Sequence, residues 1–160
     1  MKKNLLYLFA LICSVTLFTA CSDDDDPVGL STATMAGTYQ GSIDVYLGSA
    51  TGSPIVDGME VPVTVTRQDD ANVTVALSNF TIPNFLDDPV TISVPCSVEI
   101  VDGDAIMEGT STVTIEGIGT DMPVSVTGAS DGSNMGLDIE VAATVLGMPV
   151  TVYVEFVGSK

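Results

Sequence analysis

Residues 135–145 read MGLDIEVAATV, a stretch in which apolar side chains alternate with small or polar ones. Successive side chains of a β-strand point to opposite faces, so a period of two predicts a strand with one buried face. The apolar face carries Met135, Leu137, Ile139, Val141, Ala143 and Val145. A strand of this length is about twice as long as the usual five or six residues.

The same alternation recurs along most of the chain. The further segments are TYQGSIDVYL (38–47), VPVTVTR (61–67), NVTVALSNF (72–80), STVTIEG (111–117), PVSVTG (123–128) and PVTVYVEF (149–156). Turn-forming pairs such as Asp57-Gly58, Asp102-Gly103 and Asp131-Gly132 separate them. No segment after residue 30 shows a helical period with caps. The sequence therefore predicts an all-β domain.

Strands with one apolar face and hairpin-length connections form antiparallel sheets with a one-sided core. About eight such strands avoid exposed edges by closing into a barrel, and the alternative is two stacked sheets. Strands of about ten residues favour the barrel, because a tilted and coiled sheet needs long strands. We predict an antiparallel up-and-down β-barrel of about eight strands.

Several motifs along this predicted barrel are familiar. They are Gly-Thr-Tyr-Gln-Gly at 37–41, the alternating valines of 61–77, Ser-Asn-Phe at 78–80 and Phe-Val-Gly at 156–158. With them the chain resembles the calycin-like (lipocalin-like) β-barrel family of Bacteroidetes lipoproteins over nearly all of residues 35–158. The resemblance implies a small barrel on a lipid anchor, with the domain at 35–160. The shared motifs belong to the fold and not to a catalytic site, so the resemblance assigns no functional residue to this chain.

The first twenty residues are typical of a bacterial secretory signal. A basic start at 1–4 precedes an apolar run at 5–18, which is shorter than the roughly 20 residues of a membrane-spanning helix. Small Thr19 and Ala20 then precede Cys21, and 17–21 (LFTAC) resembles a lipobox. We expect residues 1–20 to be a signal peptide cleaved before Cys21, which becomes the lipid attachment site. The alternative is a secreted protein with an incidental cysteine.

Residues 21–34 are predicted to be a lipidated acidic tether. Ser22 and the aspartates 23–26 cannot enter a membrane, and their mutual repulsion keeps the segment extended. An acidic run after the lipidated cysteine also resembles the surface-export signal of Bacteroidetes lipoproteins. We therefore expect anchoring in the outer membrane through acyl chains, with the domain on the cell surface. A periplasm-facing domain is the alternative.

The charge balance excludes some partners. The chain has 21 acidic residues and four basic ones. Removal of a signal peptide leaves only Arg67 and Lys160 to oppose the acids. Such a surface repels nucleic acid and anionic headgroups, so we expect neither as a partner. Cys96 would then have no cysteine to pair with, and we expect a buried, inert thiol.

Enzymatic chemistry has few candidates in this chain. Histidine is absent, and Lys160 is the only lysine that remains after removal of a signal peptide. No evident base is therefore available to activate a serine. Paired carboxylates remain an option, since glycosidases need only two. The candidate pairs are Asp102 with Asp104 and Glu108 with Glu116, all expected to be solvated. We predict that the protein is not an enzyme and holds no cofactor.

Aspartates cluster in several predicted turns and raise the question of calcium. The clusters are 69–70, 87–88, 102–104 and 131–134, and none fits the twelve-residue calcium loop. Aspartate in turns is expected from backbone hydrogen bonding alone. We therefore predict ordinary turns and no metal site.

The barrel interior allows two functional interpretations. One is a packed core, with function moved to the outer surface and the loops 48–58 and 81–90, where Ile82, Phe85 and Leu86 form a contact patch or a lid. The other is a lipocalin-like cavity for an apolar ligand. Its predicted adaptable lining is Met59, Met107, Met122, Met135 and Met148. The expected function is a non-catalytic lipoprotein that binds a small apolar ligand or a surface partner. A pilus or adhesin subunit is the alternative.

Overall fold

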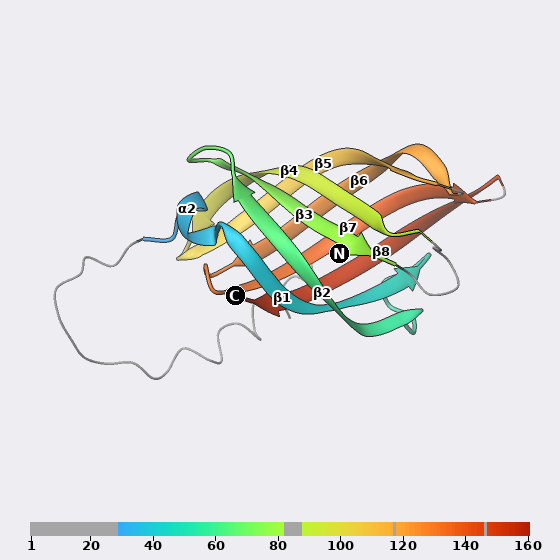
Figure 1. The fold of residues 1–160 in the computed structure, drawn as a ribbon, viewed down its shortest axis with the longest axis horizontal. Coiled ribbons are helices and arrows are strands. Elements are labelled where there is room, and N and C mark those ends of the chain that lie inside the picture. The colour runs from blue at the N-terminus through green and yellow to red at the C-terminus, as the bar shows by residue number, and fades with distance from the viewer. Residues whose placement is uncertain (1–28, 82–87, 117, 146) are drawn as a thin grey trace.

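The computed structural model describes residues 29–81, 88–116, 118–145 and 147–160, except for the side chain of Val145. One short helix precedes a series of long strands (Figure 1). The elements are α2 (Thr32–Met35), β1 (Gly37–Leu47), β2 (Val56–Arg67), β3 (Asn72–Phe80), β4 (Val90–Val101), β5 (Asp104–Ile115), β6 (Gly119–Ser130), β7 (Asn134–Val145) and β8 (Met148–Ser159). Most strands have 11 or 12 residues.

The strands form a closed barrel in which each strand pairs with its neighbours in sequence. The first and last strands also pair, antiparallel, from Gln40 opposite Ser159 to Leu47 opposite Val152. The predicted antiparallel up-and-down barrel of about eight strands is therefore confirmed, and the stacked-sheet alternative is wrong. The closure leaves no strand edge among the described strands.

The core follows the predicted alternation. In β2 and β3, for example, Val61, Val63 and Val65 and then Val73, Val75 and Leu77 point inward and are buried. The pattern also holds for β4, which the alternating segments did not include, and there the buried thiol is Cys96. Leu47 departs from the pattern. It is 39% exposed because β1 ends there, at the rim of the barrel.

The structure adds one short capped helix after residue 30, which the sequence pattern did not predict. The hydroxyl of Ser31 accepts a hydrogen bond from the backbone N–H of Thr34, and the Thr34 hydroxyl accepts one from the Ser31 N–H, which makes a capping box for α2. Four residues are too few to show a helical period in the sequence. Met35 of this helix is fully buried and belongs to the core.

Both basic residues of the described chain fix α2 to one end of the barrel, the closed end, which also carries the β2–β3 turn (Figure 1). The ammonium of Lys160 donates to the backbone carbonyls of Thr34 and Ala36 and lies 5.1 Å from the centre of the Tyr39 ring. The Tyr39 hydroxyl donates to the carbonyl of Met35 at 2.9 Å. Nε of Arg67 donates to the hydroxyl of Thr32 at 3.2 Å. Hydrogen bonds and a cation–π contact thus close this end.

Glycines allow neighbouring strands to approach closely where the barrel is sharply curved. A Cβ on Gly41 of β1 would lie 2.2 Å from the carbonyl oxygen of Val157 and 2.5 Å from Cα of Gly158, both in β8. These are backbone atoms, so a side chain at position 41 must push the two strands apart. The seam between the first and last strands therefore requires glycine at this position.

Substitution of Gly41 tests that requirement. We expect Gly41→Ala to lower the free energy of unfolding by about 1–3 kcal/mol, because the methyl group overpacks the β1–β8 seam. Gly52→Ala is the matched control, since its Cβ would meet only the Ser49 carbonyl oxygen, at 3.9 Å. Urea unfolding followed by circular dichroism measures both. Equal stability of the two variants would contradict the close approach.

Candidate functional site

The interior of the barrel is packed in its middle and toward the closed end. Several inward side chains have no accessible surface at all, namely Ile43, Val63, Val73, Ala105 and Met107. A void wide enough for a water molecule would give its lining side chains some accessible surface. The walls at these positions therefore touch one another, as in an ordinary protein core.

The methionines predicted to line a cavity differ in their burial. Met107, Met122 and Met135 are buried in the core, and Met59 is half-buried beside it. Met148 is 62% exposed, so its assignment to the lining is wrong. It follows the β7–β8 turn and projects beyond the core. The predicted residues Ile82, Phe85 and Leu86 lie outside the described residues.

A groove of about 470 Å³ lies on the outside of the barrel wall. One side is the β1–β2 loop at 48–51, and the floor is the outer surface of β5 to β8 at 106–108, 127–128, 138–140 and 153–155. We call it the outer-wall groove. Its volume lies in the range of about 300–1,000 Å³ that is usual for small-ligand sites.

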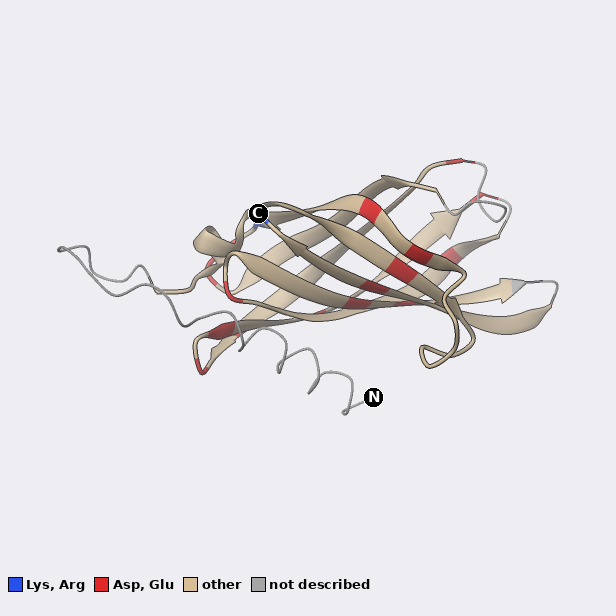
Figure 2. Cartoon of the chain, turned by 90° about the horizontal axis from the view of Figure 1, so that it is seen from below, with Lys and Arg blue, Asp and Glu red and all other residues tan. Residues whose placement is uncertain are grey.

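Strand register brings carboxylates together in this groove. Asp138 of β7 lies directly opposite Glu155 of β8 on one side and Thr127 of β6 on the other. Thr127 in turn lies opposite Glu108 of β5, so these side chains form one lateral row across the wall. Glu140 stands two residues along β7 on the same face. Figure 2 shows acidic positions gathered on adjacent strands of the wall.

Two carboxylates of the groove, Asp138 and Glu155, have raised pKa values. Burial raises the pKa of Asp138, and the negative charge of Glu140 raises it further. Burial and the charge of Asp138 also raise the pKa of Glu155, although the Tyr46 hydroxyl, which donates to Glu155 at 3.3 Å, opposes the shift. Opposed like charges destabilise a sheet. Within the described residues no basic side chain relieves them, because Arg67 and Lys160 both lie at the closed end.

The β1–β2 loop is held beside the groove by hydrogen bonds at both of its ends. The N–H of Gly48 donates to the carbonyl of Thr151 at 2.8 Å, and the N–H of Ile55 donates to the carbonyl of Val45 at 2.7 Å. The carboxylate of Asp44 accepts from the N–H of Gly58 at 2.7 Å, at a point where β1 bulges. The loop side of the groove is therefore part of the folded barrel.

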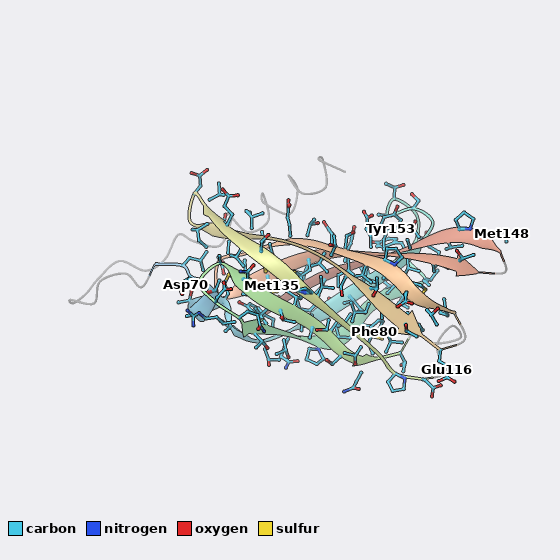
Figure 3. All side chains as sticks on the ribbon, turned by 90° about the horizontal axis from the view of Figure 1, so that it is seen from above. Asp70, Phe80, Glu116, Met135, Met148 and Tyr153 are labelled. Atoms are coloured by element: carbon cyan, nitrogen blue, oxygen red, sulfur yellow. The ribbon has the colours of Figure 1, made fainter. Side chains whose placement is uncertain are left out.

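The carboxylate pairs predicted from sequence are not brought together as catalytic pairs. Asp102 and Asp104 flank the exposed β4–β5 turn at the closed end. Glu108 and Glu116 are eight residues apart along β5 and the turn that follows it, which corresponds to about 26 Å of extended chain. Figure 3 shows Glu116 at the end of the barrel, away from Tyr153. Only Glu108 of these four lines the groove.

Sequence reasoning missed the groove carboxylates Asp138, Glu140 and Glu155. The period-two pattern places all three on outward faces, but it does not say which outward residues face one another. That information lies in the register between β7 and β8. The short interval in the sequence between the alternating segments 135–145 and 149–156 was the available signal.

The aspartate turns form ordinary turn hydrogen bonds. Asp69 accepts from the N–H of Ala71 and from the amide of Asn72, both at 2.8 Å. Asp131 accepts from the N–H groups of Ser133 and Asn134. In the described ranges no three carboxylates or thiols are placed to share a metal ion. Asp87 lies outside those ranges.

The thiol of Cys96 is buried and unpaired among the described residues, as predicted. Burial raises its pKa to about 11, so it stays protonated at neutral pH and is a poor nucleophile.

Helix α2 is the single helix of the described residues, and it is far too short to span a membrane.

Comparison with known proteins identifies the fold. A family model for the calycin-like beta-barrel domain matches residues 35–159. Among solved structures, the chain is similar to a "putative outer membrane protein" of Bacteroides fragilis, with a TM-score of 0.56 and 19% identity. The similarity covers 81% of this chain but 52% of that one, so the chain spans about half the length of this relative. No curated protein matches the chain.

The raised pKa of Asp138 predicts a pH-dependent stability. The folded protein binds the Asp138 proton more tightly than the unfolded chain does, so the free energy of unfolding falls as pH rises through the folded-state pKa. We therefore expect Asp138→Asn to raise Tm at about pH 7, and the gain to vanish at about pH 3, where Asp138 is neutral in both states. Thermal unfolding across this pH range measures it.

Asp69→Asn is the contrasting variant. Hydrogen bonds from the Ala71 N–H and the Asn72 side chain hold the pKa of Asp69 below its usual value. Ionised Asp69 therefore stabilises the fold, and this contribution is present at neutral pH and lost as pH falls. Asp69→Asn should lower Tm at neutral pH. A Tm change of the same sign in both variants would contradict the assignment.

Proposed function

The chain belongs to the calycin-like β-barrel domain family, and on that basis we propose that it is a non-catalytic, lipid-anchored binding protein of the bacterial outer membrane. Its barrel serves as a packed scaffold, and its ligand binds in the outer-wall groove. The observation that carries this proposal is the groove itself, which combines ligand-sized volume with half-buried carboxylates on a rigid wall. Binding sites on strands are positioned more rigidly than those on free loops.

The anchor rests on the sequence motif that ends at Cys21. Residues 1–20 act as a signal peptide in this proposal, and 21–34 form an acidic tether on diacylated Cys21. Two acyl chains hold a protein on a membrane durably. The similarity to a putative outer membrane protein supports an envelope location. Helix α2 joins the barrel at the closed end, so the tether leads to that end (Figure 1).

A binding role is favoured over catalysis by the placement of the acids. The groove carboxylates have no adjacent histidine, lysine or thiol, so the described residues of the groove offer no base that activates a serine or threonine hydroxyl. We propose cell-surface exposure, in keeping with the acidic tether. Nucleic acid is not a proposed partner, because the acidic surface repels it.

Substitution at Cys21 tests the anchor. Cys21→Ser should remove acyl labelling by a radiolabelled or alkyne fatty acid and shift the protein out of the membrane fraction, because no thiol remains to be acylated. Cys96→Ala is the control, since Cys96 is buried in the barrel and should leave both measurements unchanged. Persistence of the label in the Cys21→Ser protein would contradict the anchor.

Blocking the groove tests the binding site. A small-molecule library is screened by ligand-observed NMR, and each hit is measured again with Thr127→Trp, whose outward side chain fills the groove. Thr66→Trp is the matched control on the exposed face of β2. We expect hits to lose binding in the first variant and retain it in the second. Hits that bind both variants, or that shift resonances of the core residues, would overturn the outer-wall site.

A further inference from the structure

We propose that the outer-wall groove binds a small linear organic cation that carries two or more protonated amines on an aliphatic chain. This inference rests on the proposed function, since it assigns a ligand class to the same groove. Three observations support it: the spacing of the groove carboxylates, the apolar surface beside them and the absence of a basic partner for them in the described chain.

The carboxylates are spread along the groove at several different separations. Asp138 and Glu155 lie opposite each other on adjacent strands, whose spacing is about 5 Å. Asp138 and Glu140 lie two residues apart on one face of β7, at about 7 Å. Glu108 lies two strands from Asp138, at about 10 Å. Ammonium groups joined by three or four methylenes have separations on this same scale.

This spread distinguishes an extended cation from a metal ion. A metal ion needs several ligands that converge on one point, and the described carboxylates are not arranged in that way. A linear polyamine distributes its charges along its length, so each ammonium can meet a different carboxylate. The arrangement therefore matches several separated positive charges better than one concentrated charge.

The surface beside the carboxylates suits an aliphatic chain. Ile106 and the ring of Tyr153 line the groove, and the β1–β2 loop encloses one side of it. Methylenes that lie on these side chains are removed from water, which favours binding. An ammonium placed over the Tyr153 ring would gain a cation–π contact as well. Figure 3 shows Tyr153 on β8, partway along the barrel.

The described chain supplies no cation of its own to the groove. Arg67 pairs with Asp70, and Lys160 is bonded to the carbonyls of Thr34 and Ala36, all at the closed end. No basic side chain of the described residues therefore relieves the repulsion between Asp138, Glu140 and Glu155, and a cation from outside would do so. A bound polyamine removes this repulsion, so part of its affinity comes from relief of strain in the free protein.

Titration calorimetry of the acylated protein in neutral detergent tests the proposal. The ligands are spermidine and 1,4-diaminobutane, with butylamine and 1,4-butanediol as the single-charge and neutral controls. We expect one site, with affinity in the order triamine, diamine, monoamine, and no measurable binding of the diol. Affinity should fall as salt rises, because the groove is open to solvent on one side.

Paired variants locate the site. Asp138→Asn with Glu140→Gln should weaken spermidine binding about tenfold or more, because two charge-assisted hydrogen bonds are lost. Glu60→Gln with Glu116→Gln removes the same charge away from the groove and should leave the affinity within about twofold. Neither pair touches the buried core, and circular dichroism checks that both variants fold.

Several results would overturn the proposal. Equal loss in the two double variants would mean diffuse attraction to an acidic surface, and equal binding of the diol would mean that charge is irrelevant. Tighter binding of a lysine-rich peptide, with the same dependence on Asp138, would replace the small ligand by a basic protein segment. If amines fail while library hits remain sensitive to Thr127→Trp, this inference falls and the proposed function stands. If both fail, both fall.

Discussion

Antiparallel pairing between β1 and β8 is the constraint on which the rest of the structure depends. It joins residues 119 positions apart, Gln40 and Ser159, and converts a twisted sheet into a barrel without exposed edges. The seam is tight, because the backbone of Val157 and Gly158 lies where a side chain at Gly41 would be. Lys160 follows directly after β8 and reaches the carbonyls of α2. The same seam therefore also closes one end of the barrel.

Closure also determines what the outer wall presents. Inside, aliphatic side chains from all eight strands meet with no accessible surface at several positions, so the interior acts as a rigid support. Outside, the fixed register places Asp138 between Glu155 and Thr127, an arrangement that no single strand specifies. The repulsion among these acids lowers stability, and the packed core tolerates it. A protein that gives up stability at one surface site in this way commonly does so for binding.

Much of the fold could be predicted from local sequence, because a period of two is imposed by strand geometry one residue at a time. The inward faces of 61–77 and 135–143 follow directly from it. Leu47 and Met148 were expected to face the barrel interior but are exposed, because a sequence pattern does not indicate where the core ends along a strand. Helix α2 was missed because four residues hold no period, and only the Ser31–Thr34 cap marks it. The candidate site needed more: the juxtaposition of Asp138 and Glu155 is a property of register, which depends on the whole ring of strands.

The order of strands in the ring has a consequence for biosynthesis. Strand β1 cannot complete its pairing until β8 has been synthesised. The contacts at this seam are distant in sequence, and non-local contacts slow folding. The export proposed for this chain would suit such a delay, because the early hairpins alone cannot assemble a stable core ahead of translocation. Completion of the barrel thus waits for its carboxyl-terminal strand.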